Sequence, residues 1–508
     1  METKHAVRGA LVNSALIMSS RVLGMVRDMA MLAFFGMSPL LGAFNIAWVV
    51  PNMFRQLLGE GAVAAAIQPA LARAEEKDGI DASRELFAGF QATVLSALLS
   101  LLAIAWVTLF LYRGKLIDEN ALQTNLFYLI LLPYMVPICM CALASAPQNL
   151  HKHFFWPALA PILLNVCWIS GIVAGSFWAS DDGRKLHILC ACLLIGGALQ
   201  WAVQLRGLKS IGWKFKLKWK AKLKSQKSTF VMFIPALIGL AAMQINLLAD
   251  QLLVRCLVDP DANTYTFMAN RLLQLPLALI GIAAMTGAMP LFSRLAAKND
   301  VTGMNTNLRR ASETTTMLLS CAMVGLMVLT LPAVTVLFER GKVTPADSAL
   351  IAKTLQGYLW VLPIVGLSGL LTRAYQAMNS YKLPMIAALI AIPVNLILDV
   401  VWLPEYGTPA AGWATSVSML VQLLILLLGL SRHKLSFPLP IAQAWSWALP
   451  AFATLGAANT AHIYILPTYT LLNLCISIAC GGLAAVGVMS LTRKGDLAVL
   501  LRSVSKSD

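Results

Sequence analysis

Charged residues lie inside segments of the chain that are otherwise apolar enough to enter a membrane. The basic ones are Arg21, Arg27, Arg55 and Arg271, and two acids, Asp28 and Glu60, share their segments. An ionised side chain at the centre of a membrane helix costs about 2.5–3.5 kcal/mol on insertion scales. Pairing of Arg27 with Asp28 and of Arg55 with Glu60 would explain part of the set but would still leave two positive charges. Because guanidinium stays charged and donates two parallel hydrogen bonds, the excess predicts a phosphate site.

A second group of polar residues in apolar segments carries the opposite sign. It consists of Asp250, Asn395, Asp399 and Thr415. Asn395 and Asp399 are four residues apart and therefore share one helix face. One interpretation is hydrogen bonding between helices, with an aspartate that is protonated or paired, for example with Arg255. The other is a site for a coupling Na⁺ or H⁺, because all four side chains offer the oxygen ligands that hard cations prefer.

No catalytic or nucleotide-binding motif accompanies these residues. The sequence lacks G-x-x-x-x-G-K-[ST], H-E-x-x-H and G-x-S-x-G, and its six histidines lie outside the charged group. The nine cysteines lie in apolar runs without a C-x-x-C pair, which is typical of small buried side chains. We therefore expect a transporter without a cofactor, driven by an ion gradient or the membrane potential.

The composition indicates the elements that must position these charges. Of 508 residues, 58% are hydrophobic and 12% are charged, whereas a soluble domain has about 25% charged residues. A large soluble enzyme, a disordered chain and a secreted disulfide scaffold are thereby excluded. The net charge of +16 would suggest nucleic acid in a soluble protein. In a membrane protein it indicates cytoplasmic loops that face anionic lipids, with no nucleic-acid partner.

Fourteen segments are long and apolar enough to cross a bilayer, which takes about 20 residues each. We therefore predict an all-α integral membrane protein with fourteen transmembrane helices. The segments lie near 10–35, 43–71, 84–112, 122–148, 157–179, 185–206, 229–257, 264–292, 312–338, 349–378, 384–403, 409–430, 440–464 and 468–492.

The basic residues of the loops predict the orientation. With a cytoplasmic N-terminus, the inner loops contain most of the Lys and Arg residues outside the spans, which favours both termini inside. The longest inner loop alternates lysine with apolar residues from Lys214 to Lys224. We expect it to lie on anionic head groups, or alternatively to recruit an anionic substrate to the membrane surface.

Matching residue pairs indicate an internal repeat with an offset of 225 residues. Asn45 and Pro51 are six residues apart, and so are Asn270 and Pro276. The repeat predicts two six-helix lobes of like orientation, related by an axis along the membrane normal, with the substrate between them near the midplane. The predicted divisions are an N-lobe at 1–206, a basic cytoplasmic linker at 207–228, a C-lobe at 229–432, and two further helices with a cytoplasmic tail at 433–508.

Two motifs resemble signatures of the MurJ/MviN lipid II flippases. Residues 20–28 read S-R-V-L-G-M-V-R-D and are similar to the family's S-R-[VI]-L-G-x-x-R-D. Residues 51–62 read P-N-M-F-R-Q-L-L-G-E-G-A and are similar to P-N-x-x-R-x-x-x-x-E-G-A. The stretches 269–272 and 337–342 also fit, so the resemblance covers essentially the whole chain.

The resemblance implies a fold of the multidrug/oligosaccharidyl-lipid/polysaccharide exporter type in a bacterial inner membrane. Two lobes would form a V-shaped cavity, and the last two helices a groove for the lipid tail. It implies flipping of lipid II, the undecaprenyl-pyrophosphate-linked peptidoglycan precursor, to the outer leaflet by alternating access. It assigns the diphosphate to Arg21, Arg27, Arg55 and Arg271, and cavity support or gating to Ser20, Asp28, Glu60 and Asn270. Some members couple to a cation in the second lobe, which fits the acidic group.

Two departures from the family pattern remove negative charge near the arginines: Gly42 and Asn270 stand where many members have acids.

Alternative functions remain open. They are a flippase for another polyprenyl-linked oligosaccharide, a multidrug antiporter, a membrane enzyme acting on lipid phosphates, and a non-transporting scaffold of cell-wall synthesis. Expected partners are lipid II, anionic membrane lipids and the cell-wall synthesis machinery, and we expect a monomer.

Overall fold

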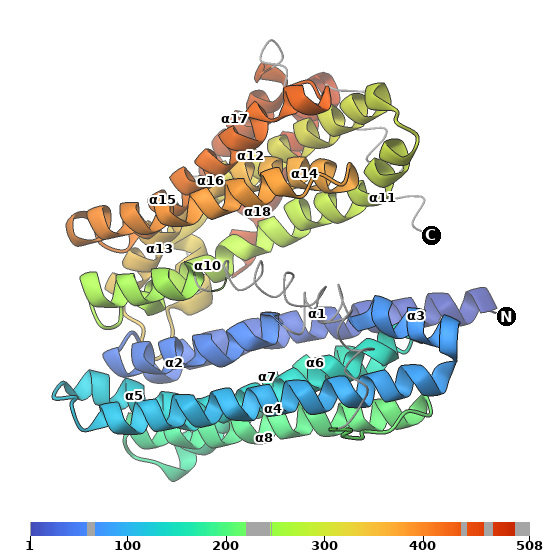
Figure 1. Cartoon of the computed structure of the whole chain (residues 1–508). Coiled ribbons are helices and arrows are strands. Elements are labelled where there is room, and N and C mark those ends of the chain that lie inside the picture. Colours follow the sequence, from blue (N-terminus) through green and yellow to red (C-terminus); the bar gives the residue numbers. More distant parts are fainter. Residues whose placement is uncertain are drawn as a thin grey trace. The chain divides into compact units, whose positions relative to one another are not determined.

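Helices account for all the regular structure in the described part of the chain. The computed structural model describes the backbone of residues 2–57, 67–219, 244, 246–437, 444–461 and 471–492. Within these ranges no residue belongs to a strand. The chain divides into two compact units, Met1–Ala249 and Asp250–Asp508 (Figure 1).

The first unit consists of long helices joined by short turns. They are α1 (Glu2–Phe35), α2 (Pro39–Arg55), α3 (Gln68–Asp78), α4 (Ile80–Arg113), α5 (Glu119–Leu131), η2 (Leu132–Tyr134), α6 (Met135–Leu150), α7 (Phe155–Trp178) and α8 (Asp182–Ser210). Local signals start several of them. The Ser38 side chain accepts a hydrogen bond from the backbone N–H of Leu41, and Pro39 follows it as the first residue of α2. Such a cap satisfies a backbone N–H group that the first helical turn leaves without a partner.

The described part of the second unit is also built of helices. Residues 246–257 are helical, and the later elements are α10 (Ala262–Pro276), η3 (Leu277–Ile282), α11 (Ala283–Ala297), α12 (Val301–Phe338), α13 (Pro345–Leu359), α14 (Val361–Ala377), α15 (Lys382–Tyr406), α16 (Pro409–Leu428), η4 (Leu430–His433), α17 (Ala444–Thr460) and α18 (Leu471–Thr492). Thr344 and Asp347 form a reciprocal capping box at the start of α13.

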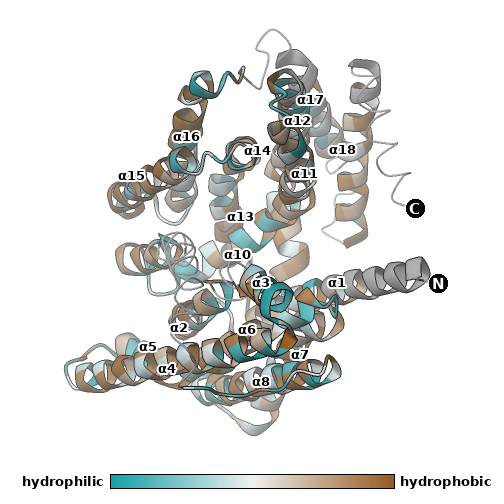
Figure 2. Ribbon diagram, turned by 45° about the vertical axis from the view of Figure 1, so that its right-hand side comes forward, coloured by the Kyte–Doolittle hydropathy of each residue, from teal (hydrophilic) through white to brown (hydrophobic). Residues whose placement is uncertain are grey.

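Ten helical segments of the described chain are long and apolar enough to cross a membrane. They are Ile80–Arg113, Glu119–Leu150, Phe155–Trp178, Asp182–Ser210, Ala262–Ala297, Val301–Phe338, Pro345–Ala377, Lys382–Tyr406, Pro409–Leu428 and Leu471–Val488. Hydrophobic residues recur along these helices (Figure 2). Large apolar side chains such as Phe110, Phe177 and Leu428 are more than 70% exposed, as expected for surfaces that face lipid.

The predicted count of fourteen spans is not confirmed. Ten predicted segments coincide with the ten found. Of the other four, the one near 229–257 lies largely outside the described residues, as do the first side chains of α1. The helices α2 and α17 contain 17 residues each, which is slightly shorter than a full crossing. The predicted boundaries of the lobes and of the linker remain predictions.

Two positions that the predicted repeat relates to each other share one unusual backbone feature. Gln56 and Leu57 form π-helical turns directly after α2, and η3 is a π-helix directly after α10. The offset of 225 residues places Gln56 and Leu57 opposite the last two residues of η3. Pro51 and Pro276, which occupy matching positions in α2 and α10, each remove one backbone donor shortly before the π-turns.

The described start of the predicted basic linker packs against protein. Trp213 is 1% exposed, and its ring centroid lies 5.5 Å from that of Phe87 on α4. Nζ of Lys218 lies 2.9 Å from Oε1 of Glu85. The lysine pattern alone did not predict this contact, because the burial of Trp213 depends on a partner in a distant helix. The remainder of the linker, from residue 220, lies outside the described residues.

The helices α13 and α16 pack closely because both have a glycine at their crossing. A Cβ atom placed on Gly412 would lie 2.3 Å from the carbonyl carbon of Gly357. One placed on Gly357 would lie 2.4 Å from the carbonyl oxygen of Pro409. One turn away, the hydroxyls of Thr354 and Thr408 are 2.6 Å apart. Small residues of this kind allow membrane helices to approach closely.

Replacing Gly412 by alanine should therefore destabilise the second unit. We expect the Gly412→Ala variant to lose about 1–3 kcal/mol, because the backbones of α13 and α16 must separate to accommodate the methyl group. Thermal unfolding of the detergent-purified protein measures this loss. The matched control is Gly456→Ala in α17, where no atom lies within 4 Å of the new methyl group. Equal melting temperatures for Gly412→Ala and the wild type would contradict the packing argument.

Candidate functional site

Arg27 is buried in α1 and is held by two neighbours. Its Nε and Nη2 atoms donate to Oδ1 of Asp28 over 2.9 and 2.7 Å, and its Nη1 donates to Oδ1 of Asn165 over 3.1 Å. Arg27 and Asp28 are 8% and 5% exposed. The predicted ion pair of Arg27 with Asp28 is therefore present. The three bonds use three of the five guanidinium N–H groups, so the fork keeps donors for an anion.

An aromatic group of the first unit supports the Arg27 side chain. The guanidinium carbon of Arg27 lies 4.4 Å from the ring centroid of Trp168 on α7. Trp168 in turn packs edge to face against Trp48 and Phe44, with centroids 4.8 and 5.8 Å away. A cation on the face of an indole gains about 0.5–2 kcal/mol, and more where water is excluded. The guanidinium is thus oriented by a carboxylate, an amide and a ring.

Asn165 also ties α1 to α7, which pack along each other (Figure 1). Its Nδ2 donates to the backbone carbonyl of Ser20 over 3.0 Å, while its Oδ1 accepts from Arg27. Ser20 therefore takes part in the cluster through its backbone. Arg21, the next residue, is exposed and has no hydrogen-bond partner among the residues that the structure describes.

The second predicted motif places its arginine at the end of α2. Arg55 is half-buried, and its Nε donates to Oδ1 of Asn52 over 3.0 Å. Next to it, Nε2 of Gln244 donates to Oε1 of Gln56 over 2.8 Å. Glu60, the predicted partner of Arg55, lies outside the described residues.

Arg271 lies in the second unit on α10. It is half-buried, and its guanidinium carbon lies 4.7 Å from the ring centroid of Phe267. Its neighbour Asn270 donates from Nδ2 to the backbone carbonyl of Thr266 over 3.1 Å. Arg271 therefore resembles Arg27 in having an aromatic support.

The predicted acidic group is brought together in the second unit. Nδ2 of Asn395 donates to Oδ1 of Asp250 over 2.7 Å and to Oδ2 of Asp399 over 3.0 Å. Ser418 donates to Oδ1 of Asn395 over 3.2 Å and to the backbone carbonyl of Thr415 over 2.9 Å. Thr415 binds a carbonyl of its own helix, that of Ala411. One amide thus bridges two buried carboxylates.

The carboxylates of Asp250 and Asp399 are the groups here that could hold a cation or a proton, whereas Asn395 turns its N–H donors toward both and its Oδ1 toward Ser418. Asp399 is fully buried, and its Oδ1 has no hydrogen-bond partner among the side chains and backbone groups that the structure describes. Two neighbouring carboxylates cannot both remain charged in a buried site without compensation. The described residues contain no cluster of three or more His, Cys, Asp or Glu side chains that could hold a metal. Arg255, the alternative partner, donates to the backbone carbonyl of Pro260.

Sequence reasoning missed three residues of these clusters. They are Asn165 and Trp168 in the first unit and Ser418 in the second. Asn165 was the easiest of the three to predict from the sequence. It is an amide within a strongly apolar segment, and such residues usually have a hydrogen-bond partner. Trp168 follows three positions later and so shares its face. Ser418 could not be selected in this way, since serine is common in membrane helices.

The Arg27–Asp28 pair should show strong coupling in a double-mutant cycle. We expect Arg27→Met and Asp28→Leu each to destabilise the detergent-purified protein by about 3–5 kcal/mol, because each leaves one buried charge without its partner. The double variant should lose much less, since it removes both charges. Melting temperatures of the four proteins measure the coupling. Additive losses would show that the two side chains do not compensate each other.

The comparisons with known proteins cover nearly the whole chain. The family model described as "Lipid II flippase MurJ" matches residues 31–479. A "Probable lipid II flippase MurJ" from Vibrio cholerae is 28% identical over 473 residues, which cover 90% of this chain and 88% of the relative. The "Lipid II flippase MurJ" of Burkholderia cenocepacia is 29% identical over 444 residues, 85% of each chain.

Solved structures agree with the family assignment. One described as "Lipid II flippase MurJ, inward closed conformation" has a TM-score of 0.78 and 26% identity, and the match covers 95% of this chain and 98% of that one. An inward-facing multidrug transporter of the MATE family, in the MOP superfamily, has a TM-score of 0.67 at 13% identity and covers 84% of this chain. The second likeness shows the fold alone. The sequence match from residue 31 to residue 479 shows that this chain, a multi-pass membrane protein, belongs to the lipid II flippase MurJ family of transporters.

Proposed function

We propose that this protein flips lipid II from the cytoplasmic to the outer leaflet by alternating access. The observation that carries the proposal is the oriented guanidinium of Arg27, buried within an apolar helix of a chain of this family. The guanidinium keeps N–H groups beyond those bonded to Asp28 and Asn165, and the diphosphate of lipid II is an anion that these donors would bind. Membership in the family supports lipid II as the substrate. The contacts of Arg27 support its role in binding the diphosphate.

The diphosphate would be bound by Arg21, Arg27, Arg55 and Arg271. Arg27 offers its remaining N–H groups in an orientation fixed by Asp28 and Asn165. Exclusion of water would strengthen each charge-assisted hydrogen bond. Exposed Arg21 would make the first contact with an entering phosphate. We assign Arg55 and Arg271 to the diphosphate as well, because each is a half-buried arginine of an otherwise apolar helical segment.

Asp28 would act as the gating partner of the substrate. It neutralises Arg27 at a distance of 2.7 Å, so the arginine is compensated when no anion is bound. A diphosphate would compete with this carboxylate for the guanidinium, and release would restore the internal pair. We assign supporting roles to Ser20, Glu60 and Asn270 because each lies in a stretch that resembles the family's sequence, next to or near one of the arginines.

The acidic group of the second unit would hold the coupling ion, Na⁺ or H⁺. Asp250 and Asp399 share the amide of Asn395, and one positive charge between them would remove much of their repulsion. Ser418 and Thr415 provide further oxygens nearby. Uptake of the ion from one side of the membrane would connect the conformational cycle to a gradient or to the membrane potential.

The last two helices would accommodate the lipid tail. α17 and α18 pack against each other and against α12. Their outward side chains include Phe452 and Leu483, which are 62% and 72% exposed. An apolar surface of this kind suits a polyprenyl chain within the bilayer.

The main alternative is another polyprenyl-linked oligosaccharide on the same fold. The arginines recognise a diphosphate and carry no information about the sugar, so the same site would serve either substrate. A scaffold of the cell-wall synthesis machinery would not require the buried guanidinium. Cytoplasmic termini, a monomeric state and binding of anionic lipids are further parts of the proposal.

The first test is replacement of Arg27. Arg27→Ala should abolish growth of a cell whose own lipid II flippase has been shut off, while membrane levels of the protein persist in an immunoblot. Arg27→Lys should also fail, because an ammonium cannot form the planar fork. Arg184→Ala, at a side chain 78% exposed, is the matched control and should support growth. Normal growth with Arg27→Ala would remove the diphosphate role.

The second test addresses the acidic group. Asp399→Asn keeps the size of the side chain but removes one of the two charges that an ion would compensate. We expect slower lipid II transport and a loss of its dependence on sodium or pH in vesicles with an imposed gradient. Asp118→Asn, at an exposed helix cap outside the group, is the control. An Asp399→Asn variant with unchanged rate and unchanged ion dependence would exclude the coupling role.

A further inference from the structure

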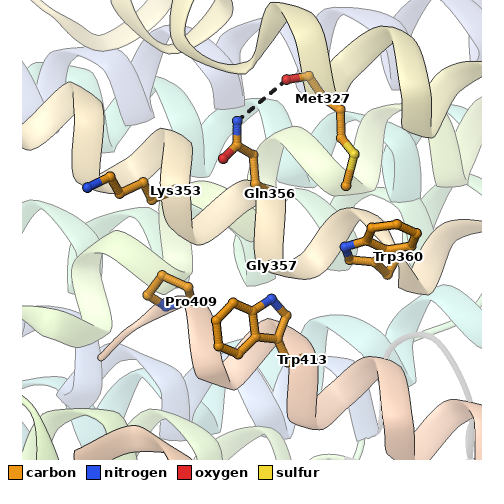
Figure 3. A pocket seen from close by; sticks show the side chains of 7 residues that line it. All are labelled: Met327, Lys353, Gln356, Gly357, Trp360, Pro409 and Trp413. Carbon is orange, nitrogen blue, oxygen red and sulfur yellow. Dashed lines mark hydrogen bonds between the residues drawn. The ribbon is translucent and has the colours of Figure 1, made fainter. Parts of the chain in front are cut away.

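A cavity of about 520 Å³ lies on the second unit, and its lining includes neither Arg271 nor a member of the acidic group. Three helices form it: α12, α13 and α16 (Figure 3). It is lined by Met327, Lys353, Gln356, Gly357, Trp360, Pro409 and Trp413. The lining combines one ammonium group, one amide and two indoles with apolar side chains. Such a lining suits an amphiphilic ligand.

The packing of α13 and α16 brings this cavity to the level at which α16, a helix long enough to cross a membrane, begins. α16 has 20 residues and is therefore about 30 Å long, the thickness of the hydrocarbon core. Its first residue, Pro409, contacts Gly357, and we infer from the length of α16 that these two residues lie near one edge of that core. Lys353 lies one turn nearer the start of α13 and hence on the aqueous side, whereas Trp413 lies one turn within the core.

The side chains at these levels match the layers of a phospholipid. Lys353 is exposed and forms no ion pair with a described carboxylate. Nε2 of Gln356 is held by the hydroxyl of Thr330 over 3.0 Å. Trp360 and Trp413 are 52% and 38% exposed. Indole rings prefer the boundary region, and a basic residue there attracts anionic head groups.

We propose that this cavity binds one anionic phospholipid of the surrounding bilayer. Its phosphate lies on the ammonium of Lys353, and its glycerol and upper acyl chains lie along Trp360 and Trp413. The charge is complementary, and an ammonium is a suitable point partner for phosphate. The inference gives the proposed binding of anionic lipids one defined site, and it does not rest on the proposed transport of lipid II.

Native mass spectrometry of the detergent-purified full chain tests the proposal. Phosphatidylglycerol and phosphatidylcholine are titrated separately, and the bound fraction is measured. We expect the wild type to retain phosphatidylglycerol preferentially. Lys353→Ala should lower its apparent affinity about fivefold, the effect of one basic residue near a lipid anion. Lys353→Arg should keep most of the affinity, and Lys115→Ala, in a loop of the first unit, should behave as wild type.

Lys353→Gln serves as a second variant if alanine impairs folding. Tryptophan fluorescence gives a site-specific readout. Phosphatidylglycerol with dibrominated acyl chains should quench the tryptophan fluorescence of the wild type more than that of the Trp413→Phe variant. Equal retention of phosphatidylglycerol by the wild type and Lys353→Ala would overturn the proposal. So would displacement of the lipid by millimolar inorganic phosphate, which indicates a free-anion site. Displacement by lipid II at equal concentration would assign the cavity to the substrate instead, and would also overturn it.

Discussion

The contact on which the first unit depends is the one between Arg27 and Asp28. A guanidinium in an apolar helix is unfavourable unless its charge and its donors are satisfied. Asp28 supplies the charge, Asn165 accepts a further hydrogen bond, and Trp168 offers a ring face. These partners come from two helices, so the need to compensate one cation also fixes how α1 packs on α7. A side chain oriented in this way loses little further entropy when it binds an anion.

The two units share a backbone pattern but differ in chemistry. Prolines at matching positions precede π-helical turns in both. The charges do not repeat, since the offset of 225 residues places Arg55 opposite Ile280 and Arg271 opposite Ile46. The first unit contains the buried guanidinium, whereas the second contains two carboxylates bridged by an amide. The two units therefore differ in the charge of their buried polar groups, and we propose an anion site in the first and a cation site in the second.

Much of this arrangement could be predicted from the sequence, because the cost of a charge in lipid makes such residues conspicuous. The pairing of Arg27 with Asp28 and the meeting of Asp250 with Asn395 and Asp399 followed from that argument. The contact of Asn165 did not, since its partner is 138 positions away and periodicity carries no information on which helices adjoin. Trp213 shows the same limit: a lysine-rich loop predicted a surface segment, while one indole is buried against α4. Helix number was the least predictable feature, because α2 and α17 are close to the length of one crossing.

Transport of lipid II across the membrane by this chain can be measured in living cells. The most direct measurement is the fraction of lipid II accessible from outside in cells whose own flippase has been shut off. We predict that expression of this protein restores the accessible fraction to that of normal cells, and that the Arg27→Ala variant does not. An accessible fraction that stays low with the wild-type protein present would contradict the account.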